Sequence, residues 1–165
     1  MRSNIPKLTN QLSNHEFLNL IPAAFQSVVF GTVDQDGNPR TNVADIELCQ
    51  NDHLIFATTF EKPFYRRLKA HPQISITALR GDETMTSVGF TLDGIAKEVD
   101  RQYIEQIFAT HPEMHRISGE NYSERRSILR PFAITPLTGS IYDLRQRPIF
   151  QKAFRFGGEH HVSNH

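Results

Sequence analysis

The segment from Phe56 to Pro72 constrains the fold more than any other, because three local structures must follow one another within it. It reads Phe-Ala-Thr-Thr-Phe-Glu-Lys-Pro-Phe-Tyr-Arg-Arg-Leu-Lys-Ala-His-Pro, which begins with residues typical of a strand. Pro63 suits the first position of a helix, where its missing N–H costs no hydrogen bond. Phe64 and Leu68 are spaced i, i+4, so they share one face of that helix. The segment therefore predicts a strand, a turn through Lys62 and a short helix that ends before the last proline.

The turn at Lys62 has the chemistry of a phosphate site. Free backbone N–H groups at the start of a helix carry partial positive charge. Here they would lie beside an ammonium group and the hydroxyls of Thr58 and Thr59. Such a corner attracts a dianionic phosphate, so a mononucleotide cofactor is the leading hypothesis. The alternative is an ordinary strand-to-helix turn with a solvated lysine, and these residues alone leave both open.

Composition limits the class of protein and its partners. The chain has 165 residues, 38% of them hydrophobic and 22% charged, which fits one globular domain with a sizeable core. Its 18 basic residues balance 18 acidic ones, so no net field attracts nucleic acid or an anionic membrane. No apolar run approaches the ~20 residues of a membrane helix, and the N-terminus lacks a signal-peptide pattern. Cys49 is the single cysteine, which allows no intrachain disulfide. We therefore expect a cytoplasmic protein that binds neither nucleic acid nor membrane.

Hairpin patterns dominate the first half of the chain. An Asp-Gly turn signal at residues 34–38 joins a β-branched strand at 27–33 to a second strand at 40–49. Pro131 and Pro136 indicate sheet edges or a break between the last strands, because proline cannot donate to a sheet ladder. Further strands are expected at residues 53–58, 74–79, 86–99 with a bulge at Asp93-Gly94, 129–134 and 139–144, and helices at residues 15–20, 63–70 and after Asp100.

These elements predict a mainly β fold, a six-stranded antiparallel barrel with helices covering its openings. We expect the barrel domain to span residues 1–144 and the remainder, residues 145–165, to form an arm. The arm is polar apart from a few large apolar side chains, which we expect to dock on a second subunit. They are Ile149, Phe150, Phe154 and Phe156.

Arg40, Thr41 and Asn42 follow the first hairpin turn and line the second strand. Arg40 could pair with a phosphate or a flavin oxygen through a charge-assisted hydrogen bond, although an exposed strand arginine is an equally good interpretation. Thr41 and Asn42 point to opposite faces of the strand. They therefore cannot both offer side chains to one pocket unless the ligand also meets backbone groups there.

Other chemistry has less support. The chain contains no G-x-S-x-G, P-loop or G-x-G-x-x-G motif, which argues against the hydrolase, NTPase and Rossmann classes. Cys49 has no basic neighbour in the sequence, and we expect a packed thiol rather than a nucleophile. Asp45 and Glu47 share a strand face, and we expect both at the surface.

The histidines give no basis for a metal centre. His111 and His115 are spaced i, i+4, but Pro112 disturbs the helix that would align them, and zinc requires three or four converging ligands. We therefore expect no metal site. Three further histidines lie near the end of the chain: His160, His161 and His165.

Several motifs occur in one order along nearly the whole chain. An Asp-x-Asp-Gly-Asn-Pro turn at residues 34–39 is followed by Phe-Ala-Thr-Thr at 56–59 and by Pro-Phe-Tyr-Arg-Arg-Leu-Lys-Ala-His-Pro at 63–72. In this order the chain resembles small bacterial members of the pyridoxamine 5′-phosphate oxidase-like FMN-binding split-barrel family. The later matching segments are Phe-Thr-Leu-Asp-Gly-Ile-Ala-Lys-Glu-Val at 90–99, Ile-Phe-Ala-Thr-His-Pro at 107–112, Ile-Tyr-Asp-Leu at 141–144 and Phe-Arg-Phe-Gly at 154–157.

The resemblance implies a six-stranded split barrel that forms a homodimer with FMN at the subunit interface. It also implies an oxidoreductase that uses FMN to transfer a hydride or electrons to an unidentified small molecule. By the resemblance, Arg40, Thr41 and Asn42 would contact the ribityl chain and the ring edge. Thr58 and Thr59 would contact ribityl or phosphate oxygens, and Lys62 would contact the phosphate. Phe56 and Ala57 would form the adjoining wall.

The chain also departs from the family pattern. True pyridoxamine phosphate oxidases carry an Arg-Lys pair where this chain has Pro63-Phe64, and an Arg-x-His element and a tryptophan near the C-terminus. This chain has no tryptophan, and its tail reads Phe-Arg-Phe-Gly-Gly at 154–158. We therefore expect neither vitamin B6 oxidation nor the FMN affinity of those enzymes.

Three alternatives remain open for function. The chain could be a non-catalytic flavin-binding module, or it could hold a deazaflavin in place of FMN. Haem binding or sensing is the third, and the tail residues His160 and His161 motivate it. If FMN is the cofactor, Arg40 near the pyrimidine edge of the ring would stabilise the anionic reduced form.

Overall fold

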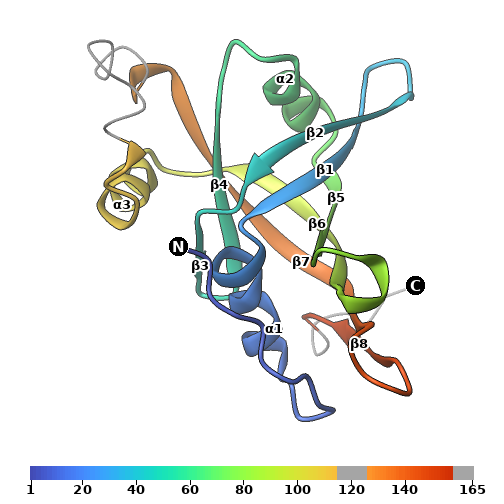
Figure 1. The fold of residues 1–165 in the computed structure, drawn as a ribbon. Helices are drawn as coiled ribbons and strands as arrows, with labels where there is room; N and C mark the ends of the chain where they lie inside the picture. Colours follow the sequence, from blue (N-terminus) through green and yellow to red (C-terminus); the bar gives the residue numbers. More distant parts are fainter. Residues whose placement is uncertain (115–125, 158–165) are drawn as a thin grey trace.

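The computed structural model describes residues 1–114 and 126–157 and is built around one curled antiparallel sheet (Figure 1). None of the helices in this described part has the length and apolar character needed to cross a membrane. The helices are α1 (Asn14–Leu20), the π-helical turn η1 (Ile21–Phe25), α2 (Pro63–Ala70), the 3-10 turn η2 (Thr84–Thr86) and α3 (Gln102–Thr110). The strands are β1 (Ser27–Val33), β2 (Pro39–Asp45), β3 (Leu48–Gln50), β4 (His53–Thr59), β5 (Gln73–Arg80), β6 (Val88–Glu98), β7 (Leu129–Asp143) and β8 (Phe150–Arg155).

The sheet closes on itself at the short connection between β2 and β3. Its strand order is β2-β1-β5-β6-β7-β4-β3, with β8 paired to β7, so β2 and β3 form the two edges. The Ile46 N–H donates to the Gln26 carbonyl beside β1 at 2.8 Å, and the Glu47 N–H donates to the Ile55 carbonyl of β4 at 2.8 Å. Consecutive residues therefore bond beside β1 and to β4, the strands next to the two edges, and the result is the split barrel that we expected.

The strand count differs from the predicted six for one physical reason. The strand expected at residues 40–49 is divided into β2 and β3, because Ile46 and Glu47 carry the chain across the gap between the sheet edges. Ile46 is fully buried there, which anchors the crossing. If β2 and β3 are taken as one bent strand, the barrel has its six strands, and β8 is an addition outside it.

The prediction that Pro131 and Pro136 mark sheet edges or a break between strands was wrong, because β7 is one continuous strand between β6 and β4. The Pro131 carbonyl accepts from the Val99 N–H at 3.0 Å, so the nitrogen of Pro131 also faces the β6 side. The β6–β7 ladder ends one residue earlier, at the pair of Glu98 and Phe132. The missing N–H of Pro131 therefore costs no ladder bond. Pro136 pairs with Gly94 where the register shifts after Asp93, which confirms the predicted bulge.

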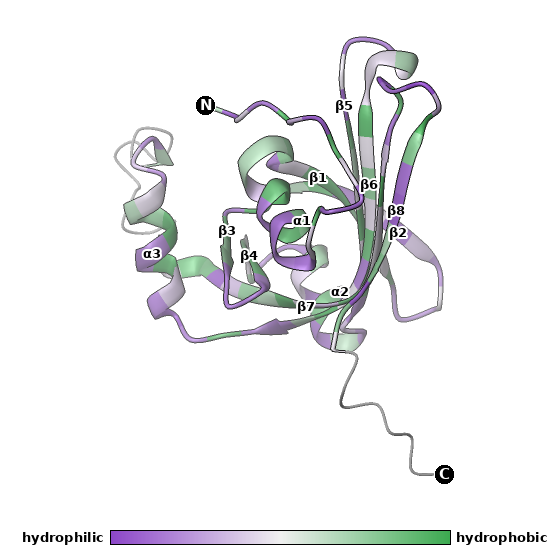
Figure 2. Cartoon of the chain, turned by 90° about the horizontal axis from the view of Figure 1, so that it is seen from below, coloured by the Kyte–Doolittle hydropathy of each residue, from purple (hydrophilic) through white to green (hydrophobic). Residues whose placement is uncertain are grey.

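Apolar residues on α1 and α2 fill the two openings of the barrel. Phe64 and Leu68 of α2 are buried as their spacing predicts. The Phe64 ring lies 5.1 Å from the ring centroid of Phe30 on β1. At the other opening, Phe17 of α1 packs edge-on against Phe90 of β6, with ring centroids 6.1 Å apart. Figure 2 shows α1 within the curve of the strands, which is the position a plug requires.

β8 folds the predicted arm back onto its own chain. Phe154 stacks on Phe17 with a ring centroid distance of 4.3 Å, and Phe150 and Phe156 pack against the same core. These rings therefore do not need a second subunit to cover them, because β8 returns along β7. Only Ile149 of the four apolar side chains remains strongly exposed, at 44%. Residues 158–165 lie outside the described part of the chain.

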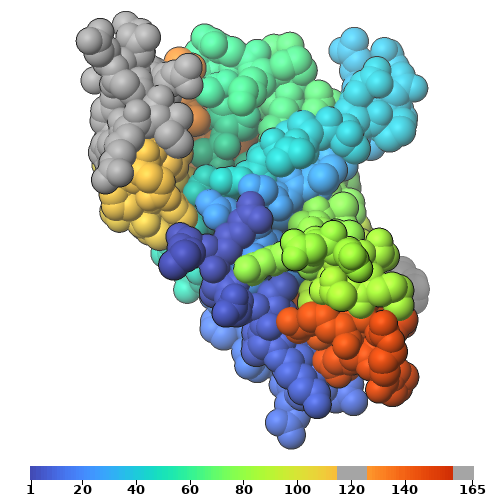
Figure 3. All heavy atoms as spheres, in the orientation of Figure 1, coloured from blue at the N-terminus to red at the C-terminus, as the bar shows by residue number. Residues whose placement is uncertain are grey.

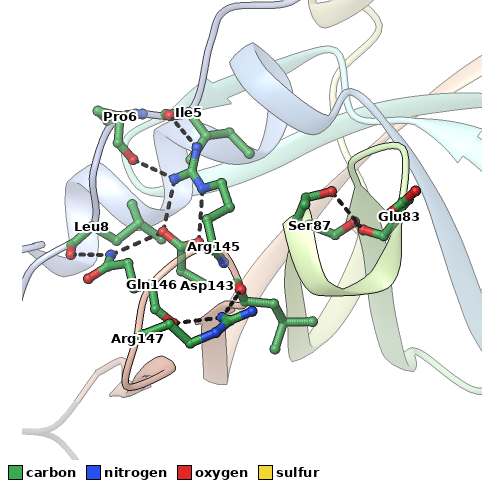
Figure 4. A network of polar contacts seen from close by, with 11 residues as sticks. Ile5, Pro6, Leu8, Glu83, Ser87, Asp143, Arg145, Gln146 and Arg147 are labelled. Atoms are coloured by element: carbon green, nitrogen blue, oxygen red, sulfur yellow. Dashed lines mark hydrogen bonds and ion pairs between the residues drawn. The ribbon is translucent and has the colours of Figure 1, made fainter.

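A buried carboxylate ties the N-terminal segment to the end of β7 (Figure 4). Asp143 has no exposed surface and accepts a hydrogen bond from Arg145 Nε at 2.9 Å. The Arg145 guanidinium also donates to the carbonyls of Ile5 at 3.0 Å and Pro6 at 2.9 Å. Burial acts to raise the pKa of Asp143, but the hydrogen bonds from Arg145 and Gln146 outweigh it and hold the pKa below its usual value.

α3 covers the outer face of β4 and β7. Its buried side chains Ile104, Ile107 and Phe108 pack against Ile55 of β4. The N-cap position of α3 is Arg101 and not the predicted Asp100, but the Asp100 carboxylate still accepts from the N–H of the first helical residue, Gln102, at 2.8 Å. α3 therefore lies on the opposite side of the sheet from the barrel core (Figure 1).

His111 fastens the end of α3 to the crossing segment. Its Nε2 atom lies 3.2 Å from a carboxylate oxygen of Glu47 and 3.0 Å from the Glu47 carbonyl, and its Nδ1 atom lies 3.2 Å from Glu113. The Glu47 side chain is only 12% exposed, so the prediction of a surface residue was wrong, because the crossing carries it under α3. Its burial raises its pKa to about 7. Burial acts to lower the pKa of His111, but the Glu47 carbonyl and the charges of Glu47 and Glu113 raise it overall.

The remaining metal and thiol predictions can be placed only in part. Within residues 1–114 and 126–157, no group of three or more histidine, cysteine or acidic residues could hold a metal ion. His115, His160, His161 and His165 lie outside the described residues. Cys49 is partly buried, and its burial raises the pKa of the thiol to about 11, which suits a packed thiol.

Asp143→Asn should weaken the N-terminal clasp. The amide cannot pair with the Arg145 cation as the carboxylate does, so we expect the free energy of unfolding to fall by about 2 kcal/mol. Urea denaturation at pH 7 measures the change. Asp82→Asn, at an exposed loop position, is the matched control, and equal stability of the two variants would contradict the clasp.

The Glu47–His111 contact should make stability depend on pH above neutrality. The raised pKa of His111 gives stabilisation that is complete below about pH 6.5 and is lost as the pH rises through the folded pKa. Glu47 ionises near pH 7 when folded but near 4.5 when exposed, so its burial destabilises the fold above that range.

Both effects have the same sign, so wild type should lose about 1 kcal/mol more stability than Glu47→Gln between pH 6 and pH 9. Urea denaturation at the two pH values makes the comparison, with the exposed Glu61→Gln as control. If wild type and Glu47→Gln show the same pH dependence, the contact does not act as described.

Candidate functional site

The turn between β4 and α2 forms a corner of unusual polarity. Lys62 precedes α2 in extended backbone conformation, and Pro63 occupies the first helical position. The Lys62 N–H donates back to the Thr59 carbonyl at 3.2 Å, and the Phe60 N–H donates to the Ile128 carbonyl at 3.1 Å. These two bonds fold residues 59–62 tightly against the start of β7. We call Thr58, Thr59, Glu61, Lys62 and Phe64 the β4–α2 corner.

Several donors in the β4–α2 corner have no acceptor among the described residues. They include the backbone N–H groups of Glu61 and Phe64, the hydroxyls of Thr58 and Thr59, and the Lys62 ammonium. Thr58 is only 4% exposed, yet every fully buried side-chain oxygen or nitrogen in this part of the chain has a partner. The Thr58 hydroxyl must therefore reach solvent, where a ligand can accept from it.

The residues of β4 alternate between the barrel core and α3. Phe56 and Thr58 face the core side, and Phe56 is fully buried there with its ring centroid 4.7 Å from that of Phe30. Ala57 packs against the cluster beneath α3, and Thr59 follows it on that face by alternation. Phe56 can therefore meet a surface ligand only through its backbone. The two threonine hydroxyls leave the strand in opposite directions.

Arg40 and Asn42 share the α2 side of the β1–β2 hairpin. Their cross-strand partners are Thr32 and Phe30, which point into the barrel. Arg40 forms an ion pair with Asp34 at 3.1 Å. Arg40 also borders a pocket of about 330 Å³ between the hairpin tip and α2. The pocket is lined by Asp34, Gln35, Asp36, Arg40, Pro63, Arg66, Arg67 and Ala70.

Thr41 lies on the opposite, outer face of the hairpin. It pairs with Gly31, and two residues further Val43 pairs with Val29. The predicted alternation of Thr41 and Asn42 is thus observed in the strand. Within one chain, the residues expected to hold a cofactor form a pocket side at Arg40, a corner at Thr58 and Lys62, and an outer face at Thr41, rather than a single pocket.

Two arginines near these positions were not predicted. Arg67 donates through Nε to the Thr32 hydroxyl at 2.8 Å and through Nη2 to the Asn42 side-chain oxygen at 3.3 Å. Its spacing of three residues from the buried Phe64 was a signal that it borders the covered face of α2. Arg130 of β7 pairs with Thr58 across the sheet. No local pattern could have found that contact, because it depends on the register of distant strands.

One neighbouring charge of α2, that of Lys69, already has a carboxylate partner. The Tyr65 hydroxyl donates to Glu98 at 2.9 Å, and Lys69 lies 3.4 Å from the other oxygen of that carboxylate. The hydrogen bond to Glu98 raises the pKa of Tyr65, while the positive charge of Arg130 acts to lower it. Lys62 differs from Lys69 in having no carboxylate partner among the described residues. The corner as a whole therefore suits a phosphate ester, which accepts from N–H, O–H and ammonium donors.

The chain matches the model of the family described as pyridoxamine 5′-phosphate oxidase over residues 14–138. No curated protein has a sequence that matches it. The matched segment begins at α1 and ends within β7, so it includes the whole β4–α2 corner and the β1–β2 hairpin.

Solved structures share the fold at low sequence identity. A heme binding protein from Mycobacterium smegmatis is 16% identical, with a TM-score of 0.67 over 87% of this chain and 58% of that one. A pyridoxamine 5′-phosphate oxidase-related, FMN binding protein from Nostoc punctiforme is 13% identical, with a TM-score of 0.58 over 79% of this chain and 80% of that one. An F420 reductase is 18% identical, with a TM-score of 0.56 over 75% of this chain and 94% of that one. The split barrel, the order of its motifs and the extent of the family match together lead to one conclusion: the chain belongs to the pyridoxamine 5′-phosphate oxidase family.

Proposed function

We propose that this protein is an FMN-binding flavoprotein whose β4–α2 corner holds the phosphate of the cofactor. The observation that carries the proposal is the set of unpartnered donors around Lys62. A protein normally satisfies such groups within its fold or with a ligand. The family membership and the FMN-binding neighbour from Nostoc punctiforme support FMN as that ligand.

Lys62, Phe64 and the two threonines of the corner each have a definite task in this proposal. The Lys62 ammonium neutralises part of the phosphate charge, and the Phe64 N–H and Thr58 hydroxyl donate to its oxygens. Arg40, Thr41 and Asn42 then follow the ribityl chain toward the ring edge, with Thr59, Ala57 and the backbone of Phe56 on the adjoining side. FMN, when bound, supplies hydride or electron transfer. Arg40 stabilises negative charge at the pyrimidine edge.

We propose that the protein works as a homodimer, with the outer face of β1, β2 and β5 as its interface. Val43, Val29 and Thr77 lie in one row across these strands. Val43 is 68% exposed and Leu79, two residues beyond Thr77, is 55% exposed. Among the described residues, α3 packs over β4, β7 and Leu48 of β3, and β2 runs across the face shown in Figure 3. Thr41 lies on the same outer face, so a cofactor reaching it would lie at the interface.

The substrate is a small molecule other than a B6 vitamer in this proposal, and the protein acts in the cytoplasm. The uncharged pair Pro63-Phe64 stands where true pyridoxamine phosphate oxidases have Arg-Lys. A non-catalytic flavin-binding module would use the same cofactor contacts. Reduction of the bound flavin by reduced nicotinamide or another reductant separates the two, because only the enzyme needs it.

The alternative cofactors are haem and a deazaflavin. The Mycobacterium smegmatis neighbour is named a heme binding protein and another neighbour an F420 reductase, which keeps both in view. The histidines that motivate haem binding, His160 and His161, lie outside the described residues. Haem titration of a chain ending at Gly158 tests that alternative, since loss of binding would implicate those histidines.

Lys62→Ala should weaken FMN binding about tenfold, because it removes a charge-assisted contact to the phosphate. The chromophore released on denaturing the purified protein is identified by mass, and FMN titration of the apoprotein by flavin fluorescence then gives the dissociation constant. Lys7→Ala, which removes an exposed lysine in the N-terminal segment, should leave that constant within twofold. Equal affinity of Lys62→Ala and wild type would contradict the phosphate corner.

Val43→Glu should convert a dimer to a monomer, because it places a charge in the centre of the proposed apolar interface. Size-exclusion chromatography with light scattering measures the mass. Ile149→Glu is the matched control, since it changes an exposed apolar residue on the β7–β8 turn rather than on this face. If Ile149→Glu dissociates the dimer and Val43→Glu does not, the interface lies at the C-terminal arm instead.

A further inference from the structure

Arg130 lies directly opposite Thr58 in the ladder between β4 and β7. Residues opposite one another in antiparallel strands extend their side chains to the same face, with Cβ atoms about 5 Å apart. Thr58 faces the barrel end that α2 covers. The side chain of Arg130 therefore leaves the sheet on the same side as the side chain of Thr58, the corner threonine that is almost fully buried.

The turn between β4 and α2 packs beneath this guanidinium. The central carbon of the Arg130 guanidinium lies 4.9 Å from the ring centroid of Phe60, and Phe60 is 40% exposed. The Phe60 N–H also donates to the Ile128 carbonyl at 3.1 Å. The turn is therefore tied to the residue just before β7, and the Arg130 guanidinium lies over the Phe60 ring of that turn.

Part of the hydrogen-bonding capacity of Arg130 is still available. Its Nη1 atom donates to the carbonyls of Ser127 at 2.7 Å and Leu129 at 2.9 Å. Its Nε and Nη2 atoms have no acceptor among the described residues. A guanidinium has five N–H donors in a planar fork, so an arginine fixed at one end in this way can still bind a phosphate or carboxylate with the rest.

Two cations of α2, Lys69 and Arg67, are committed outside the corner, and Arg66 already donates to the backbone of a corner residue. Lys69 pairs with Glu98, Arg66 donates to the Glu61 carbonyl at 3.1 Å, and Arg67 bonds to Thr32 and Asn42. Lys62 alone supplies one positive charge to a phosphate group that carries about two negative charges. The first two helical residues that follow it, Pro63 and Phe64, are uncharged.

We propose that Arg130 is a second phosphate-binding residue of the β4–α2 corner. It acts with Lys62 and supplies from β7 the positive charge that Pro63 and Phe64 do not provide. This inference rests on the proposed FMN site and extends it, because it assigns a residue far from the corner in sequence. It also makes the affinity for the phosphate ester depend on the pairing of β4 with β7.

The test compares FMN with riboflavin, which has the same ring and ribityl chain but no phosphate. Arg130→Gln should weaken FMN binding about tenfold or more and leave riboflavin binding within twofold. Titrations of both ligands followed by flavin fluorescence give the ratio of dissociation constants. Arg130→Lys, which keeps the charge and loses the fork, should give an intermediate ratio, and it takes the place of Arg130→Gln if that variant does not fold.

Arg101→Gln is the matched control, because Arg101 Nη1 donates to the same Ser127 carbonyl at 3.0 Å. Arg101 lies at the start of α3 and is not part of the β4–α2 corner. It should leave the ratio of FMN to riboflavin affinity unchanged. An unchanged ratio in the Arg130 variants, with Lys62→Ala still selective for FMN, would overturn this inference alone. Equal loss of both ligands in Arg130→Gln would also overturn it, since that indicates a structural role. A wild type that binds FMN no better than riboflavin would overturn the proposed phosphate corner as well.

Discussion

Two neighbouring backbone amides close the sheet, and most of the structure depends on that closure. The N–H groups of Ile46 and Glu47 donate to carbonyls beside β1 and on β4, which lie at opposite ends of the strand order, so the chain must cross the gap at this point. The crossing buries Ile46 in the core and carries Glu47 beneath α3, where His111 meets it. Closure also leaves two open ends, which α1 and α2 fill (Figure 1). The start of α2 is fixed over the end of β4 as a result.

The hydrogen-bond donors of the β4–α2 corner are left by this arrangement without acceptors among the described residues. α2 is short and must turn Phe64 and Leu68 inward to close the barrel. Its first turn therefore stands at the rim with free N–H groups, next to the end of a strand. In the described part of the chain, the corner included, every fully buried polar side-chain atom has a partner, so the corner side-chain donors without an acceptor reach solvent. Donors gathered at one rim, with Lys62 and Arg130 beside them, form a site whose chemistry favours a phosphate ester.

Local patterns predicted the features that local physics determines. The bounds of α2 follow from Pro63 and the spacing of its apolar residues, and the bulge at Gly94 follows from the Asp-Gly pair. The central placement of β7 was missed, because whether a proline interrupts a ladder depends on where the neighbouring strand ends. Glu47 and Arg130 were missed for a similar reason. Burial of the first depends on a barrel crossing, and the position of the second depends on strand register, neither of which leaves a local pattern.

A crystal structure of the FMN complex would show directly whether the β4–α2 corner binds the phosphate of a flavin nucleotide. We expect phosphate oxygens within hydrogen-bond distance of the Lys62 ammonium, the Thr58 hydroxyl and the Phe64 N–H. A phosphate located instead in the pocket between Arg40 and Arg66, with the corner donors facing only water, would contradict it.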